Sequence, residues 1–257
     1  MMTRALALNG AKRIYILGRR FDILYRAAQS INPNIVKPFA CDATSLESLL
    51  LAAAHVEQEA GSINLLIANA GTMGPRPLPT ATTSIAAYRA HALDTPMQQF
   101  TDVYATNTTS VYYTSLAFLE LLHAGNTLSS TVRSQIIAMS SIGGFSRLSG
   151  ASFAYSSSKA AVTHMVKMMA TAWVPFGIRC NVLAPGLVQS ELAAGVIGKL
   201  GGKEGGIDEN VIPAGRTGGE EDIAGAVLYM ASRAGAYLNG SVVVVDGERL
   251  GVLPSTY

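Results

Sequence analysis

Six short runs of apolar residues, each followed by turn-forming residues and a helical stretch, restrict the fold of this chain more than any other feature. The runs span residues 13–17, 35–41, 63–68, 135–140, 178–183 and 241–245. Their apolar residues are mostly consecutive rather than alternating with polar ones, as in strands buried on both faces. Strands of this kind separated by helices predict an α/β fold: a doubly wound (Rossmann-type), mostly parallel sheet with helices on both faces.

The segments between these runs carry helix signals. We expect helices over 1–8, from about 20 to 30, over 97–123 and from Tyr155 towards Trp173. The capping-box patterns Thr44–Glu47 and Thr217–Glu220 predict two further helix starts. Residues 72–96 are rich in Pro, Thr and Ala and predict a loop or insertion, whereas the Gly-rich residues 195–219 predict a mobile lid over a substrate. Neither an internal repeat nor a linker is visible, so we expect one domain over 1–257.

Composition excludes several classes of function. The chain has 257 residues with 19 Lys and Arg against 17 Asp and Glu, and it has no basic run, which argues against nucleic acid as a partner. No apolar run approaches the length of a membrane span, and Arg4, Asn9 and Lys12 interrupt any signal-peptide core. Cys41 and Cys180 are far apart in sequence, so we expect free thiols in a reducing compartment. These features predict a cytoplasmic protein.

The stretch from Ser140 to Lys159 suggests chemistry. Tyr155 and Lys159 are four residues apart, which places them on the same face of a helix, one turn from each other. An ammonium beside a phenol would lower its pKa from about 10. A hydroxyl from Ser141 could bind a carbonyl oxygen nearby. Together these groups predict a proton-transfer site that moves hydrogen on and off an alcohol.

Further candidate residues fall where the predicted strands end. Ligands of doubly wound sheets bind beyond the carboxyl ends of the strands. The residues at those ends are Asp42, Asn69, Gly71, Ser141, Pro185 and Gly186. Three of them also have an ordinary structural interpretation: Asp42 could be no more than a helix-start residue, and Asn69 and Gly71 could simply end a strand in a tight turn. The four histidines lack metal-ligand spacing, so no metal site is expected.

Taken together, these motifs resemble the short-chain dehydrogenase/reductase family. The resemblance covers nearly the whole chain up to Asp246-Gly247, and it is specific as a set although each motif alone is weak. The matching elements, in order, are Asn69-Ala70-Gly71, Asn107, Ser141, Tyr155 with Lys159, and Asn181 with Pro185-Gly186. The family implies an oxidoreductase that transfers hydride between a nicotinamide cofactor and a small-molecule carbonyl or secondary alcohol, usually as a homodimer or homotetramer.

The resemblance also implies roles for individual residues. Tyr155 would be the general acid/base, Lys159 would bind the nicotinamide ribose and Ser141 would polarise the substrate carbonyl. Asn107 would hold a water molecule in a proton relay. The expected cofactor-binding residues, beside Tyr155 and Lys159, are Arg19, Asp42, Asn69, Ala70, Gly71, Pro185, Gly186, Val188 and Ser190. Arg19 stands where an acidic residue would bind the ribose 2′-hydroxyl of NAD, so its cation favours NADP, although NAD is possible.

One element of the family pattern is absent from the sequence. The family begins with a strand and a Gly-rich phosphate loop, but this chain contains no Gly-x-Gly and begins with what resembles the helix after that loop. We therefore expect the first strand of the sheet to be missing. Either the start codon has been placed too far downstream, or this is a short form that binds cofactor poorly.

Two other functions remain open at this stage. The chain could be a cofactor-deficient, non-catalytic binding or scaffold protein of the same fold. It could also be an enzyme of that fold that catalyses dehydration or isomerisation. The sequence does not identify the substrate.

Overall fold

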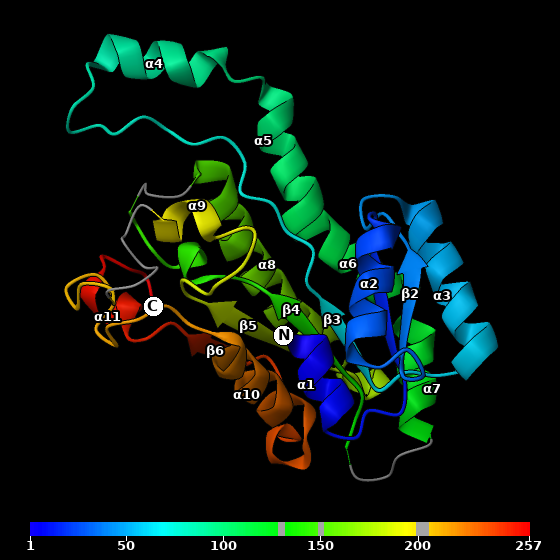
Figure 1. The fold of residues 1–257 in the computed structure, drawn as a ribbon. Helices are drawn as coiled ribbons and strands as arrows, with labels where there is room; N and C mark the ends of the chain where they lie inside the picture. Colours follow the sequence, from blue (N-terminus) through cyan, green and yellow to red (C-terminus); the bar gives the residue numbers. More distant parts are fainter. Residues whose placement is uncertain (128–131, 149–151, 199–205) are drawn as a thin grey trace.

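The computed structural model describes residues 1–127, 132–148, 152–198 and 206–257, and it has the predicted α/β architecture (Figure 1). Its strands form two parallel sheets rather than one. One sheet pairs β1 (Ile14–Gly18) with β2 (Val36–Ala40). The other has the order β3-β4-β5-β6, formed by Leu65–Ala68, Gln135–Met139, Arg179–Pro185 and Val242–Val245. The strand positions predicted from the sequence are confirmed to within two residues at most ends.

Helices cover both faces of the sheets. They are α1 (Met2–Leu8), α2 (Phe21–Ile31), α3 (Leu46–Ala60), α4 (Ile85–Asp94), α5 (Met97–Tyr104), α6 (Ser110–Ala117), α7 (Leu119–Thr127), α8 (Phe153–Ala172), α9 (Ala194–Ile197), α10 (Glu220–Ala231) and α11 (Arg249–Val252). One apolar cluster joins α3, α6 and α8 to one face of the strands. A second joins α1 and α10 to the other face, so the strands lie between two helical layers.

The core is densest around β4 and β5. Every residue of β4 is buried, as are all residues of β5 except Pro185. Parallel strands at the centre of a sheet lose solvent on both faces and on both edges, which explains why QIIAM and RCNVLA are nearly free of charge. The one cation there, Arg179, donates to the carbonyl oxygens of Gly235 and Leu238, both at 3.0 Å. Burial of this charge is therefore compensated.

Two helix starts differ from the capping-box predictions. The N-cap of α3 is Ser45, whose hydroxyl accepts from the Ser48 amide, so the prediction of Thr44 was wrong by one residue. The Thr44 hydroxyl instead donates to Asp42. The helix α10 begins after Gly219 rather than Thr217, and the Asp222 carboxylate accepts from the Gly219 amide at 2.7 Å. In both cases a residue other than the predicted threonine accepts the hydrogen bond at the helix start.

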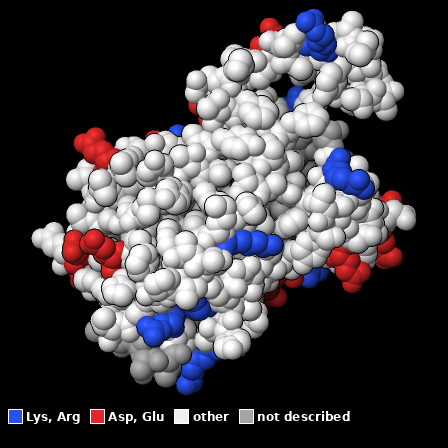
Figure 2. Space-filling model, turned by 180° about the vertical axis from the view of Figure 1, so that it is seen from behind, with Lys and Arg blue, Asp and Glu red and all other residues white. Residues whose placement is uncertain are grey.

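The expected loop over 72–96 was wrong in part, because it contains α4. The Ser84 hydroxyl caps this helix by accepting from the Ala87 amide. Figure 1 shows α4 standing away from the sheets at the end of an extended segment, with α5 leading back to them. The arm formed by residues 75–97 borders a hollow of about 420 Å³, visible at its base in Figure 2.

The long helix expected over 97–123 is interrupted. A π-helical segment, Ala105–Thr109, separates α5 from α6, and a break at Phe118 separates α6 from α7. Single π-helical turns inside α-helices are rare and occur frequently at functional sites. The Gly-rich stretch 195–219 contains the last part of α9, and its residues 199–205 lie outside the described residues.

The predicted doubly wound, parallel α/β architecture is confirmed, with the observed strands divided between two sheets. Strand β1 pairs only with β2, and β3 pairs only with β4, among the strands that the structure describes. The edges of β1 and β3 border a cleft of about 2,470 Å³. Within residues 1–127, 132–148, 152–198 and 206–257, no strand lies between these two edges.

Charge on the molecular surface is dispersed. Figure 2 shows basic and acidic side chains scattered over one face, mostly towards its margins, with one basic side chain near the middle of a wide uncharged area. Within the described residues, no helix is both long and apolar enough to cross a membrane.

Candidate active site

The N-terminus of α8 positions the two residues singled out by their spacing. Ser152 is the N-cap, and its hydroxyl accepts from the Tyr155 amide. The first turns of the helix lie beside the carboxyl end of β4, so Tyr155 and Lys159 both face inwards and are 8% and 3% exposed. The Lys159 Nζ lies 5.9 Å from the centroid of the Tyr155 ring. The expectation that the two side chains share one face of a helix is confirmed.

Lys159 is held in place by the sheet. Its Nζ donates to the Met139 carbonyl oxygen at 2.7 Å, where β4 ends. An ammonium has three donors, so two remain for a ligand. Burial lowers the pKa of Lys159 from 10.5 to about 8. The group is still mostly charged at neutral pH.

The expected fall in the Tyr155 pKa was wrong. Burial raises the pKa of this phenol above its ordinary value, and a hydrogen bond with the Ser141 side chain opposes that rise. Burial has the largest effect on the Tyr155 pKa because the Lys159 ammonium lies over the Tyr155 ring and donates to the Met139 carbonyl oxygen rather than to the phenol oxygen. At neutral pH the phenol is therefore protonated and can act as an acid.

The serine pair separates into two roles. The Ser140 hydroxyl makes its hydrogen bonds inside the core. It donates to the Lys159 carbonyl oxygen at 2.9 Å and lies 2.7 Å from the Thr163 hydroxyl. Ser141 instead caps the short 3₁₀ turn Ile142–Gly144 and accepts from the Gly143 amide. Gly143 brings this turn against Tyr155, because a Cβ there would lie 3.1 Å from the ring and 3.4 Å from the Ser141 Oγ. Of the two serines, only Ser141 is beside the phenol.

Asn107 is completely buried in the π-helical segment. Its Oδ1 accepts from the Thr72 amide at 2.8 Å, and its Nδ2 donates to the Thr72 carbonyl oxygen and to the Ser158 hydroxyl, both at 2.9 Å. The side chain thus fastens the chain after β3 to α8. Gly71 lies next to it: a Cβ there would be 3.5 Å from Asn107 Oδ1 and 3.6 Å from Lys159 Nζ.

The ends of β1, β2 and β3 converge on the 2,470 Å³ cleft. Six of the predicted cofactor-binding residues line it, namely Arg19, Asp42, Asn69, Ala70, Gly71 and Ser190. The Asp42 carboxylate accepts from the Thr44 amide and hydroxyl, and these bonds hold its pKa below the usual range. Gly71 connects this cleft to Asn107 and Lys159, so the two groups of candidate residues are contiguous.

The end of β5 contributes the remaining candidates. Gly186 passes so close to β6 that a Cβ would lie 2.8 Å from the Asp246 Cα, so only glycine fits there. Val188 points into the second apolar cluster with Met139 and Leu183 rather than into the cleft. Pro185 and Gly186 lie at the same edge of the sheet as Ser141, though outside the lining of the large cleft.

An ion pair that the sequence analysis did not anticipate spans the rim of the cleft. Arg20, two residues after β1, donates through both terminal nitrogens to the Glu191 carboxylate at 3.2 and 3.0 Å. Both residues line the cleft, and they lie on opposite sides of the gap between the two sheets. Arg20 and Glu191 are 171 positions apart in the sequence, and no local pattern connects them. Within the described residues, His, Cys, Asp and Glu do not cluster in a way that could hold a metal ion.

Comparison with known proteins gives consistent matches. A family model described as enoyl-(acyl carrier protein) reductase matches residues 2–247. The short-chain dehydrogenase/reductase PhomF′ of Diaporthe leptostromiformis is 45% identical over 266 residues, covering 100% of this chain and 89% of the relative.

Two further similarities agree with these matches. The short-chain dehydrogenase/reductase SAT3 of Stachybotrys chartarum is 42% identical over 272 residues, covering 100% of both chains. A solved structure described as the Pseudomonas aeruginosa RhlG/NADP active-site complex shares the fold with a TM-score of 0.76 at 24% identity, covering 96% of this chain and 89% of that one. The chain belongs to the short-chain dehydrogenase/reductase family of oxidoreductases.

Proposed function

We propose that this protein interconverts a carbonyl group and a secondary alcohol of a small molecule with NADP(H) as the hydride carrier. The observation that carries the proposal is the buried Tyr155 phenol, which lies beside the Ser141 turn and has the Lys159 Nζ 5.9 Å from its ring centroid. Through Gly71 this group adjoins a cleft of about 2,470 Å³. Pockets for single small ligands usually measure about 300–1,000 Å³, so the cleft has room for a dinucleotide.

The residues around the cleft fit such a cofactor. Asp42 would meet the adenine, Asn69 to Gly71 would follow the dinucleotide, and Pro185, Gly186, Val188 and Ser190 would contact the nicotinamide end. The two free donors of Lys159 suit ribose hydroxyls. When bound, the nicotinamide would supply or accept the hydride. The buried position of Val188 makes a contact through its backbone the more suitable one.

The charge at the cleft favours NADP over NAD. Arg19 and Arg20 follow β1 directly and line the cleft beside Asp42. A guanidinium binds a phosphate in a two-pronged manner, as the 2′-phosphate of NADP would require. Arg20 already contacts Glu191, which leaves Arg19 as the better candidate for this phosphate.

In the reductive direction, the protein would supply a proton. Tyr155 would donate it from its phenol oxygen to the substrate oxygen, for which its raised pKa keeps it protonated at neutral pH. Ser141 would hold the same substrate oxygen with its hydroxyl. The Lys159 ammonium would stabilise the phenolate that remains, and Asn107 would support a water relay that restores the proton.

Three finer properties are also proposals. The hollow of about 420 Å³ beneath the α4 arm, next to Phe153 and Ala154, would form part of the substrate pocket together with the residues after β5. A homodimer or homotetramer, the assembly usual in the family, is the second of these proposals. The buried free thiols of Cys41 and Cys180 fit a cytoplasmic location.

The decisive experiment compares the wild-type chain with Tyr155→Phe. We expect NADPH to enhance its fluorescence on titration with either protein, and a panel of ketones to be reduced about 10²–10⁴-fold more slowly by the variant. Tyr112→Phe is the matched control, because Tyr112 is 40% exposed and is not one of the candidate site residues. Equal rates for wild type and Tyr155→Phe would refute the mechanism, and absence of any NADPH binding would favour the non-catalytic alternative.

A further inference from the structure

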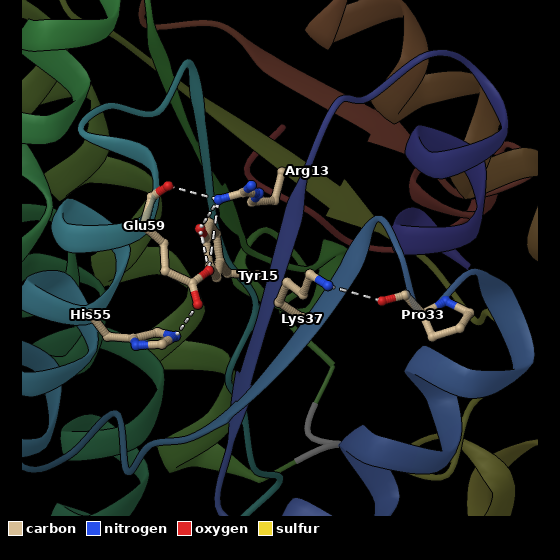
Figure 3. A network of polar contacts seen from close by, with 6 residues as sticks. All are labelled: Arg13, Tyr15, Pro33, Lys37, His55 and Glu59. Atoms are coloured by element: carbon tan, nitrogen blue, oxygen red, sulfur yellow. Dashed lines mark hydrogen bonds and ion pairs between the residues drawn. The ribbon is translucent and has the colours of Figure 1, made fainter.

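Two sets of hydrogen bonds outside the active site join segments that are distant in sequence. The first lies at the start of β1, where Arg13 donates to the Tyr15 hydroxyl at 3.2 Å and to the Glu59 carbonyl oxygen at 2.8 Å (Figure 3). This network joins β1 to the end of α3 at the amino end of the strand. Ser141 and Tyr155 lie instead at the carboxyl end of β4, so the first set does not reach them.

The second set holds the segment next to Ser141. Residues 253–257, which we call the strap, follow α11 and run antiparallel to residues 145–147, with one isolated bridge between the two segments. Residues 145–147 come directly after the 3₁₀ turn Ile142–Gly144, which Ser141 caps. The strap is therefore joined to the segment that follows a candidate catalytic side chain.

Backbone hydrogen bonds and a ring contact fasten the strap to this segment. The Arg147 amide donates to the Pro254 carbonyl oxygen at 2.8 Å, and the Thr256 amide donates to the Phe145 carbonyl oxygen at 2.9 Å. The Thr256 hydroxyl donates to the same oxygen at 3.2 Å. The rings of Phe145 and Tyr257 meet edge to face, with centroids 5.1 Å apart, which is a favourable aromatic geometry. Thr256 thus supplies two of the bonds that hold the segment.

The strap begins from a fixed position. The Asp246 carboxylate, directly after β6, accepts from the Glu248 amide at 3.1 Å and from the Leu250 amide at 2.8 Å. The Leu250 side chain is buried, and the Arg249 guanidinium donates to the Val211 carbonyl oxygen at 2.5 Å. These contacts fasten α11 to the end of the central sheet, so the strap can transmit that position to the turn.

The turn itself is packed against α8. A Cβ on Gly143 would lie 3.1 Å from the Tyr155 ring, and one on Gly144 would lie 2.8 Å from the Lys159 carbonyl carbon. The Gly143 amide donates to the Ser141 Oγ and the Gly144 amide to the Ser141 carbonyl oxygen, both at 3.0 Å. The helix therefore limits the turn at its glycines, and the strap holds the residues directly after it.

We propose that the strap positions the Ser141 hydroxyl beside the Tyr155 phenol, with Thr256 as the positioning residue. Within the described part of the chain, the hydrogen bonds of Thr256 go to Phe145, so it acts through the turn and not on the substrate. The catalytic consequence rests on the proposed function, in which Ser141 holds the substrate oxygen. Small displacements of such a donor reduce the rate strongly.

The first test measures amide hydrogen exchange in the full chain by NMR. Thr256→Pro removes both the amide donor and the hydroxyl. The amides of Gly143 and Gly144 should then exchange at least about fivefold faster, because both are bonded to Ser141, while that of Ile137 in β4 should change less than about twofold. This measurement needs neither cofactor nor substrate, so it is independent of the proposed function.

Two variants serve as controls. Ser255→Pro introduces the same ring one position earlier, where no hydrogen bond between described residues involves the amide, and it should change exchange at Gly143 less than about twofold. Thr256→Val keeps the amide and loses only the 3.2 Å bond, so its effect should lie between those of the two proline variants. Unchanged exchange in Thr256→Pro, an equal effect of Ser255→Pro, or equal acceleration at Ile137 would overturn the proposal.

The second test is a double-mutant cycle with Ser141→Ala, using a ketone and NADPH. Thr256→Pro should lower kcat about tenfold with KM changed less than about twofold, and it should lower kcat less than about twofold when Ser141 is already alanine. Equal losses in both backgrounds would show a general structural effect and contradict the proposal. If wild type reduced no ketone while the exchange pattern appeared, the proposed function would fail and the positioning of Ser141 by the strap would stand.

Discussion

The strands β1 and β4 have similar sequences but very different surroundings. IYILG and QIIAM are both short and apolar, yet every residue of β4 is buried whereas every residue of β1 is only partly buried. The difference lies in their neighbours: β4 is paired on both edges, and β1 on one. The half of the molecule that carries Tyr155 and Lys159 rests on the complete sheet. The half that carries Arg19 and Asp42 rests on a two-stranded sheet, which is marginal by itself.

Amide exchange should reveal this contrast most strongly. The Ile137 amide lies between two strands, whereas the Leu17 amide faces the cleft. We expect Leu17 to exchange about 100-fold faster than Ile137 or more, because core strands open only with global unfolding. Measurement by NMR on the isolated chain checks this. Similar rates at the two positions would mean that the cleft edge of β1 is closed in solution.

Core truncation should separate the same two regions energetically. Ile137→Ala removes a fully buried side chain and should lower the free energy of unfolding by about 2–5 kcal/mol. Ile16→Ala in β1 removes a partly buried one and should cost about 1 kcal/mol. Urea unfolding measures both. Equal losses would contradict the view that β1 contributes less to the core.

Replacement of the active-site lysine should stabilise the protein while impairing its function. Lys159→Met removes a buried ammonium group, whose pKa is lowered to about 8. Near pH 7 we expect the free energy of unfolding to rise by about 1–3 kcal/mol, a net value that includes loss of the bond to the Met139 carbonyl oxygen. Functional sites commonly carry such a cost in stability. Lys167→Met, at an exposed position of the same helix, is the control and should leave stability nearly unchanged.

The pH dependence of this gain has a definite sign. The folded-state pKa of Lys159 is below the unfolded value, so between about 8 and 10.5 the unfolded state binds more protons. The contribution of Lys159 to the free energy of unfolding of the wild-type protein therefore rises with pH between these two values. The advantage of Lys159→Met should be full below pH 8 and shrink as the pH approaches 10.5. A constant difference would show that packing rather than charge sets the effect.

The ion pair across the cleft should give the smallest effect. Arg20 and Glu191 are exposed, so their removal should leave the thermal midpoint unchanged within error. Glu191→Gln frees Arg20 and removes one negative charge from the rim, so we expect about two- to fivefold tighter NADPH binding at low salt, lost at high salt. Glu57→Gln, on an exposed part of α3, is the control. Weaker binding by Glu191→Gln would show that the ion pair orders the site.

The sequence alone predicted much of the fold and the composition of the site. Consecutive apolar runs located the six strands, and the four-residue spacing placed Tyr155 and Lys159 together, because both features depend on local backbone geometry. The helix starts at Ser45 and Gly219 were missed, since several oxygens nearby could cap either helix. The helix α4 was missed because none of its residues is buried, so its sequence lacks the apolar stripe by which a core-facing helix is predicted.

The remaining properties of the site depend on contacts between distant segments and were determined only by the tertiary structure. Burial of the Tyr155 phenol raises its pKa rather than lowering it, because this desolvation outweighs the hydrogen bond with Ser141. The tertiary structure directed the Lys159 Nζ to Met139, engaged Asn107 with Thr72, and paired Arg20 with Glu191. It also left β1 and β3 facing each other across an open cleft. Spacing along a chain fixes which side chains share an element, but desolvation and strand pairing are properties of the assembled fold.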